Sequence, residues 1–252
     1  MHVNNKKTIM WGQKSNFKLK FDDVMKESNT DKQPKVKPSK KTTPETKKDV
    51  SILNKELASS MKCPMIYETN FVKNPDEMYN LFNKTFDFRK RTIGQKNAKL
   101  NRQTCVFGDN EHIDSIPKIW GNDVKISIWT KELKEIKEKI EKLTGAKYNI
   151  CLANYYENGF NTIGYHSDRE EFGSVSNIAS ISLGVERIFR FREKKDRSYE
   201  IDFHLENGCL IVMGDNCQEL YEHCIVKDEL IKKGRINLTF RLFDVKRYEI
   251  LS

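Results

Sequence analysis

The hydrophobic residues of the chain follow two different spacings, and the change between them comes at Gly145. Before Gly145, two segments carry apolar side chains every three or four positions, which is the spacing of one helix face. The first begins at Asn74-Pro75, a cap residue followed by a proline in the first turn, and the second runs from Thr130 to Gly145. We expect both segments to be amphipathic helices that pack one face against the rest of the protein.

After Gly145 the apolar positions fall in short runs, many of which alternate with polar residues as in strands of a sheet. The expected strands cover residues 148–156, 163–168, 178–184, 187–192, 199–205, 209–213, 222–226 and 236–243. Many short strands at close spacing are typical of a sandwich or jelly roll. We therefore predict a mainly β protein whose two flanking helices cover one sheet.

The first 60 residues differ from the rest in composition. They hold 14 Lys and 7 Asp or Glu, a surplus of +7 out of the net charge of +9. Residues 29–50 have almost no large apolar side chain, so burial cannot offset the conformational entropy that ordering would cost. We expect a disordered lysine-rich arm over residues 1–60 and one folded domain over residues 61–252.

The role of this arm stays open. Lysines suit a polyanion such as nucleic acid, because each neutralised phosphate releases counterions. The alternative is a solvated linker. Met10-Trp11 and residues 17–21 are apolar islands, which are either a docking motif for a protein partner or inert.

The cysteines and the hydropathy pattern bear on the compartment. None of the six cysteines forms a C-x-x-C pair, which argues against a zinc or redox motif. No apolar signal segment follows Met1, and no run approaches the roughly 20 apolar residues that cross a bilayer. We expect a soluble monomer with reduced thiols in the cytoplasm or nucleus, not a secreted protein, and no membrane contact.

Candidate metal ligands lie in the segment from Asn154 to Asp168. His166 and Asp168 are two residues apart, a spacing that points both side chains to one face of a strand. Two His and one carboxylate form the facial triad of non-haem Fe(II) oxygenases, which leaves other metal positions open. His223 is the best third ligand and His204 is its rival.

A second pattern lies in residues 235–241, where alternation sorts the side chains onto two faces. One face carries Arg235, Asn237, Thr239 and Arg241. Two arginines that point into a fold are costly unless they meet an anion. A dicarboxylate such as 2-oxoglutarate suits them, because a guanidinium binds a carboxylate through two parallel hydrogen bonds. The alternative is an Arg–Asp bridge at a sandwich edge.

The ordered combination of these motifs resembles the AlkB family over roughly residues 61–245. The motifs are Asn-x-Tyr-x-x-Gly from Asn154, His-x-Asp-x-Glu from His166, then His223, then Arg-x-Asn-x-Thr-x-Arg from Arg235. Members of that family are Fe(II)- and 2-oxoglutarate-dependent dioxygenases that repair alkylated nucleobases. The resemblance implies a double-stranded β-helix, a cupin-like jelly roll with the metal between its two sheets.

The resemblance also assigns two sets of ligands. It places Fe(II) on His166, Asp168 and His223, and 2-oxoglutarate on Asn154, Tyr156, Arg235, Asn237 and Arg241. By the same resemblance Tyr156 and Arg235 meet the distal carboxylate, and the other three residues lie near the keto-acid end. O₂ is the second co-substrate.

Substrate contacts are inferred in the same way. A methylated base inside a duplex must be extruded to reach such a metal. Glu170 matches the acidic residue that follows the metal ligands and would meet the exocyclic amine of the base. Phe107 falls where the family has an aromatic stacking residue, and its alternative is a core position. Further aromatic candidates without an assigned role are Trp120, Tyr165 and Phe172. The basic residues of segment 88–102, which we expect to be turn-rich, are candidates for phosphate contact, with a solvated loop as the alternative.

The expected activity is oxidative demethylation of bases such as 1-methyladenine and 3-methylcytosine in DNA, with RNA as a further substrate. The products would be formaldehyde, succinate and CO₂. Two alternatives stay open: a related oxygenase acting on protein or lipid, and a non-catalytic nucleic-acid binder. Asp168 and Glu170 could also form a carboxylate pair for acid–base chemistry, but the arginines make that interpretation unnecessary. Arg169 stands where related repair enzymes often carry an acid, so the base preference is open.

Overall fold

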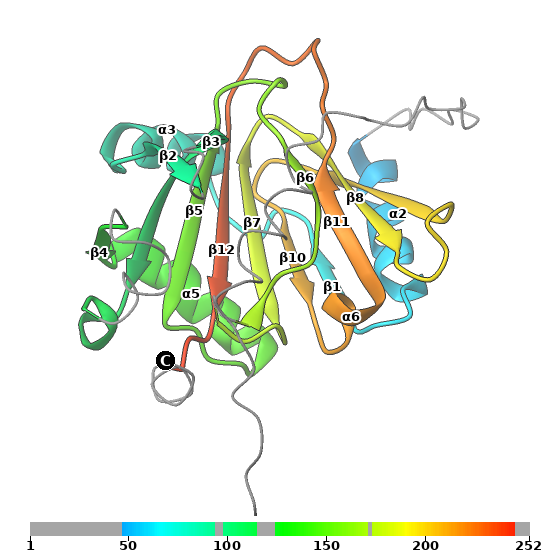
Figure 1. Cartoon of the computed structure of the whole chain (residues 1–252), viewed down its shortest axis with the longest axis horizontal. Helices are drawn as coiled ribbons and strands as arrows, with labels where there is room; N and C mark the ends of the chain where they lie inside the picture. The colour runs from blue at the N-terminus through cyan, green and yellow to red at the C-terminus, as the bar shows by residue number, and fades with distance from the viewer. Residues whose placement is uncertain (1–46, 94–97, 115–123, 171–172, 245–252) are drawn as a thin grey trace, which may run out of the picture.

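The computed structural model describes residues 47–93, 98–114, 124–170 and 173–244. Within them the chain forms two β-sheets that face each other, with helices on the outside (Figure 1). The larger sheet has the strand order β1-β10-β7-β12-β5-β3-β2, with β4 paired to β3, and the smaller sheet has the order β6-β11-β8-β9. This two-sheet arrangement confirms the predicted jelly roll.

The elements have the following bounds. The larger sheet is made of β1 (Met65–Glu68), β2 (Arg89–Ile93), β3 (Ala98–Gly108), β4 (Ile126–Ile128), β5 (Ile150–Tyr156), β7 (Ile178–Gly184), β10 (Leu210–Met213) and β12 (Arg235–Arg241). The smaller sheet is made of β6 (Ile163–His166), β8 (Arg187–Glu193), β9 (Glu200–Leu205) and β11 (Tyr221–Ile225). The helices are α2 (Lys47–Ser60), α3 (Pro75–Thr85), α5 (Lys131–Thr144) and α6 (Cys217–Leu220), with a 3-10 turn, η2, over Asn110–His112.

Helix α5 begins and ends at the residues that the sequence indicates, and α3 begins at Pro75 as expected, although the Asn74 side chain makes no capping hydrogen bond. The Thr130 hydroxyl accepts a hydrogen bond from the Leu133 amide at the start of α5. Gly145 ends α5 in the left-handed region, at φ 72°, and its amide bonds back to Glu141. Both helices lie on the face of the larger sheet that is turned away from the smaller sheet (Figure 1).

The two faces of the larger sheet have different chemistry, because side chains alternate along each strand. The face under α3 and α5 is apolar and belongs to one buried cluster that includes Phe82, Ile136 and Leu238. The opposite face meets the smaller sheet through apolar residues on β1, β7 and β10. On β5 and β12, in contrast, the inward face carries polar side chains, and these set the place of the candidate site.

Segment 88–102 corrects one expectation. We expected a turn-rich loop there, but its basic residues lie on β2 and β3, which pair antiparallel at one edge of the larger sheet. Charged side chains are common on edge strands, where they discourage pairing with other chains. The charges led us to expect a loop, but they are equally compatible with an edge strand. Lys96 of this segment lies outside the described residues.

The N-terminal boundary also differs from the expectation. Residues 47–60 form α2 rather than disordered chain, and this helix packs on the strands β1 and β9. Asn54 is fully buried, and its side chain donates to the His204 carbonyl at 2.7 Å and accepts from the His204 amide at 3.1 Å. The helix was missed because a lysine-rich sequence masks the few apolar positions, such as Val50 and Ala58, that it buries. Residues 1–46, with the two apolar islands, lie outside the described part of the chain.

A disulfide corrects the expectation of reduced thiols. Cys63, just before β1, is bonded to Cys217 at the start of α6, with 5.3 Å between their Cα atoms. The other four cysteines are free and buried. The two bonded cysteines are 154 residues apart in sequence, so no local spacing motif could predict the disulfide.

None of the helices in the described part of the chain has the length and apolarity that crossing a membrane requires.

The bonds between Asn54 and His204 predict a stability effect. Asn54→Ala removes both and leaves the His204 amide and carbonyl unsatisfied inside the protein, which should lower the free energy of unfolding by about 1–3 kcal/mol. Urea denaturation measures this, with Glu56→Ala on the exposed side of α2 as the control. Equal midpoints for the two variants would show that α2 is not anchored through Asn54.

Candidate active site

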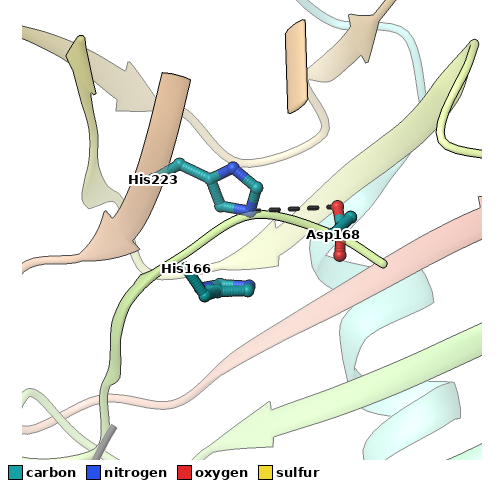
Figure 2. Close-up of side chains that lie close together, drawn as sticks. All are labelled: His166, Asp168 and His223. Atoms are coloured by element: carbon teal, nitrogen blue, oxygen red, sulfur yellow. Dashed lines mark ion pairs between the residues drawn. The ribbon is translucent and has the colours of Figure 1, made fainter. Parts of the chain in front are cut away.

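Three side chains from two distant segments of the sequence converge on the inner side of the smaller sheet. His166 ends β6 and lies directly opposite His223 on β11, and Asp168 follows two residues later. One ligand atom from each residue lies within 4.8 Å of the others. Figure 2 shows the His223 ring pointing at the Asp168 carboxylate, with 3.8 Å between Nε2 and Oδ2, and the His166 ring beside it. The structure thus brings together the three predicted metal ligands.

The rival histidine lies elsewhere. His204 is on β9 and its Nδ1 atom is 2.8 Å from the Glu186 carboxylate. This contact raises the pKa of His204, so the ring tends to carry a proton and a charge. His204 is not part of the cluster with His166.

Neighbouring groups orient His166 and Asp168. The His166 Nδ1 atom lies 2.9 Å from the Gly164 carbonyl, so this nitrogen carries the proton and Nε2 keeps its lone pair. The Asp168 amide donates to Gln218 Oε1 at 2.8 Å, and the Ser167 hydroxyl donates to the Tyr221 carbonyl at 2.9 Å. The segment after β6 is therefore anchored to α6 and β11.

The protonation states suit a divalent metal. Burial and the neighbouring His166 lower the pKa of His223 to about 3, and burial also lowers that of His166. Burial opposes the charge of Asp168, but Arg241 and the two histidines outweigh it and the pKa of Asp168 is lowered. At neutral pH the cluster thus consists of two neutral imidazoles and one carboxylate. This is the donor set of a non-haem Fe(II) site with open positions.

Facing this cluster, β5 and β12 pair so that their polar residues form rows across the larger sheet. Asn154 lies opposite Asn237, and Tyr156 lies opposite Arg235. The guanidinium of Arg235 is 5.4 Å from the centre of the Tyr156 ring. Alternation therefore places all four predicted side chains on the face that looks toward the metal ligands.

Arg235 is the most unusual of these residues. It is only 1% exposed, and its Nη2 atom donates to the Ser182 hydroxyl at 2.9 Å. Its Nε and Nη1 atoms have no hydrogen-bond partner among the described residues. Burial lowers its pKa, yet a guanidinium stays charged at neutral pH. A buried cation with two unused donors fits a carboxylate-bearing ligand.

A second buried arginine holds the loops beside Arg235. Arg187, 2% exposed, donates to the carbonyls of Asn158, Asn161 and Val226 and so ties the loop after β5 to the loop after β11. Burial and the neighbouring Arg235 lower its pKa to about 10. Arg187 carries no signal in the sequence, because its role depends on two loops that only the fold brings together.

The other end of β12 is held by the main chain. Arg241 donates to the carbonyls of Arg169, Gly173 and Ser174, and its Nη1 atom lies 3.8 Å from Asp168 Oδ1. Arg241 therefore stands beside the metal ligands and holds the segment that follows them.

The proposed substrate residues fare differently. Phe107 is 4% exposed, and its ring centre is 4.4 Å from that of Phe86 in the core beneath the helices. It lies on the opposite face of the sheet from the site, so its assignment to base stacking was wrong. Glu170 is exposed two residues after Asp168, at the edge of the site. Tyr165 packs on Arg192 at 3.6 Å, away from the metal ligands, and Trp120 and Phe172 lie outside the described residues.

Strand β3 supplies residues that the sequence analysis did not assign. Thr104 lies opposite Asn154, so Arg102, Thr104 and Val106 share the face of the site. The Thr104 hydroxyl is buried and has no partner within the described part of the chain. The alternation of residues 102–107 was the available signal, but the charges nearby led us to expect a loop.

Comparison with known proteins identifies the class. The family model of the 2OG-Fe(II) oxygenase superfamily matches residues 65–241, and the chain belongs to that superfamily. Its solved neighbour OsALKBH1 superimposes with a TM-score of 0.54 at 20% identity, covering 72% of this chain and 99% of that chain, a likeness of fold.

Within the superfamily the chain's likeness is to proteins of the AlkB family. It is 34% identical over 122 residues to the human alpha-ketoglutarate-dependent dioxygenase alkB homolog 3. The aligned residues cover 45% of this chain and 43% of that protein. It is 32% identical over 121 residues to the human DNA oxidative demethylase ALKBH2, covering 45% and 46%. Protein R406 of Acanthamoeba polyphaga mimivirus is 26% identical over 167 residues, covering 62% and 87%. The chain thus spans less than half of the length of the two human enzymes.

Membership confirms the cofactor prediction of Fe(II) with 2-oxoglutarate and O₂ as co-substrates. The residues present fit these groups. The His-Asp-His cluster has the donor set for iron, and the unused donors of Arg235 can bind a carboxylate of 2-oxoglutarate.

The bond between Gln218 and the Asp168 amide predicts an effect on metal affinity. Gln218→Leu removes the acceptor that positions Asp168 and should weaken Mn(II) binding about tenfold or more, as outer-shell changes generally do. Calorimetric titration measures this, with Glu219→Ala on the exposed side of α6 as the control. Unchanged affinity in Gln218→Leu would remove this role.

The lowered pKa of His223 predicts acid sensitivity of the metal-free protein. Between about pH 6.5 and about pH 3 the unfolded chain binds a proton at this ring and the folded chain does not. The free energy of unfolding should therefore fall as the pH drops through this window, by up to about 1.4 kcal/mol per pH unit. Urea denaturation at several pH values tests this, since His223→Gln should flatten the profile. An equally steep profile in the variant would contradict the assignment.

Proposed function

We propose that the protein oxidatively demethylates N-alkylated nucleobases of the 1-methyladenine and 3-methylcytosine type. The substrate would be DNA, with RNA as a further substrate, and the products formaldehyde, succinate and CO₂. One observation carries the proposal: a buried arginine with two unused donors faces a His-Asp-His cluster of the right protonation state. The names of the relatives, one of them a DNA oxidative demethylase, supply the substrate class.

The proposed roles divide between the two sheets. From the smaller sheet His166, Asp168 and His223 would hold Fe(II), with the proton on Nδ1 of His166 leaving Nε2 free for the metal. From the larger sheet Arg235 and Tyr156 would bind the distal carboxylate of 2-oxoglutarate, since they lie side by side in one row. When bound, iron and 2-oxoglutarate activate O₂ to oxidise the N-methyl carbon, and the hydroxymethyl product loses formaldehyde.

The keto-acid end of 2-oxoglutarate would lie near the metal. We assign it to Asn154, Asn237 and Arg241, of which Arg241 stands nearest the metal ligands, 3.8 Å from Asp168. Arg241 also keeps Asp168 ionised, because its charge lowers the pKa of that carboxyl. Arg235 and Arg187 line the buried pocket around Tyr156 and exclude water behind the distal carboxylate.

Recognition of the base is assigned to the exposed edge of the site. Glu170 lies two residues after Asp168, where its carboxylate would accept from the exocyclic amine of adenine or cytosine. The 1-methyladenine and 3-methylcytosine bases are cations, which a nearby carboxylate also favours. The expected compartment, cytoplasm or nucleus, and the monomeric state stay predictions, as does a protein partner for the N-terminal arm.

Turnover of defined substrates tests the proposal. The protein is incubated with Fe(II), 2-oxoglutarate and O₂ and with single-stranded or duplex DNA, or RNA, that carries 1-methyladenine or 3-methylcytosine. We expect formaldehyde release in step with succinate, its loss in His166→Ala, and a higher requirement for 2-oxoglutarate in Arg235→Met.

Other outcomes would select the alternatives. Succinate formed only with a protein or lipid substrate would indicate an oxygenase of that kind. Binding of nucleic acid without turnover, equal in wild type and His166→Ala, would indicate a non-catalytic binder.

A further inference from the structure

The side chain of Arg102 reaches the candidate co-substrate pocket from β3. Thr104 pairs with Asn154 across the sheet, and Arg102, two residues earlier, projects to the same face. Its Nε atom donates to Asn154 Oδ1 at 2.7 Å. Asn154 is only 5% exposed, so this bond is partly shielded from water.

This bond decides which way the Asn154 amide points. Asparagine carries a donor at one end of its amide and an acceptor at the other, whereas a guanidinium has only donors. A hydrogen bond from Arg102 must therefore end on the oxygen, and the Nδ2 group of Asn154 turns away from Arg102. That group has no hydrogen-bond partner among the residues that the structure describes. It is therefore free to donate to an anion in the pocket.

The neighbouring amide on β12 is not available in this way. Asn237 Nδ2 donates to the Ser180 hydroxyl at 2.6 Å and to the Ile181 carbonyl at 3.2 Å. Its oxygen accepts from the Thr239 hydroxyl at 2.9 Å. Both N–H groups of Asn237 are thus spent on the protein, and of the two amides in this row only Asn154 offers a donor to a ligand.

The end of β3 that carries Arg102 is itself fixed. Asn101 Nδ2 donates to the Phe160 carbonyl at 2.8 Å, and Asn161 Nδ2 donates to Asn101 Oδ1 at 3.1 Å. These bonds join β3 to the loop after β5. They support the backbone next to Arg102, whose guanidinium bonds to Asn154.

We infer that Arg102 is a positioning residue of the 2-oxoglutarate pocket, which orients the Asn154 amide so that its N–H group meets the keto-acid. The inference rests on the proposed function, since it takes the pocket to bind 2-oxoglutarate. It gives Arg102 a role different from the phosphate contacts that its basic segment suggests. It also makes the two asparagines near the keto-acid unequal, because among the described residues Asn154 has a free N–H group, whereas both N–H groups of Asn237 are bonded within the sheet.

Calorimetric titration of the Mn(II)-loaded protein with 2-oxoglutarate tests the inference without turnover. Arg102→Met should weaken binding about tenfold, the factor that a hydrogen bond to a charged group typically contributes. Arg102→Lys keeps a donor and should recover much of the affinity. Lys90→Met removes a positive charge from the exposed side of the same hairpin and should leave the affinity unchanged.

A double-mutant cycle separates orientation from a general effect of charge. If Arg102 acts through Asn154, Arg102→Met should have little further effect in an Asn154→Ala background. Additive losses, or equal binding by wild type and Arg102→Met, would overturn the inference. So would a loss confined to nucleic-acid affinity with a reduced salt dependence, which would mark Arg102 as a phosphate contact.

Two further outcomes keep the result interpretable. If the wild-type protein binds Mn(II) but not 2-oxoglutarate, the proposed function fails before the role of Arg102 is reached. If thermal melting shows that Arg102→Met does not fold, Arg102→Lys and Arg102→Gln are compared in its place. Arg102→Lys has only donors and should bind 2-oxoglutarate within a few-fold of wild type, whereas Arg102→Gln can also accept a hydrogen bond and should bind more weakly. Equal binding by the two variants would overturn the inference.

Discussion

The buried positive charge of Arg235 constrains the rest of the site. This residue lies on β12 in the middle of the larger sheet and faces inward, where water does not reach it. A guanidinium in such a place is costly unless its donors are used. Ser182 takes one of them, and two nitrogen atoms find no partner in the described residues. An anion bound beside Arg235 would neutralise this charge. It would be surrounded by the polar row of β5 and β12, the nearby Tyr156 and the loops tied by Arg187.

The metal ligands impose the complementary requirement from the smaller sheet. Direct pairing of His166 with His223 brings the two rings together, and Asp168 closes the cluster. Burial keeps both rings neutral, and Arg241 keeps the carboxylate ionised. A divalent cation bound by the smaller sheet would face the larger sheet, which carries the buried guanidinium groups. A keto-diacid suits both sheets at once. One end can chelate the metal, and the carboxylate at the other end can pair with the positive charge of Arg235.

Residues outside the recognised motifs hold this arrangement in place. Gln218 fixes the main chain of Asp168, and its helix α6 is bonded to the start of β1 through Cys63 and Cys217. Arg187 joins two loops behind the co-substrate pocket, and Arg102 orients Asn154 from β3. These contacts come from four different parts of the chain. Outer contacts of this kind set ligand geometry and so affinity, as the supporting partners of metal sites generally do.

The local sequence determined much of this protein by itself. Helix caps at Thr130 and Gly145, the alternation of β5 through β12 and the ordered motifs around His166 and Arg235 were readable because each depends on residues close in sequence. The tertiary structure decided the rest. Phe107 proved to be a core residue, because a shift of one position on a strand changes the face that a side chain occupies. Other features depend on contacts between distant segments, which a local sequence pattern cannot predict. They are the basic strands β2 and β3, the helix α2, the Cys63–Cys217 bond and the partners of Arg102, Arg187 and Gln218.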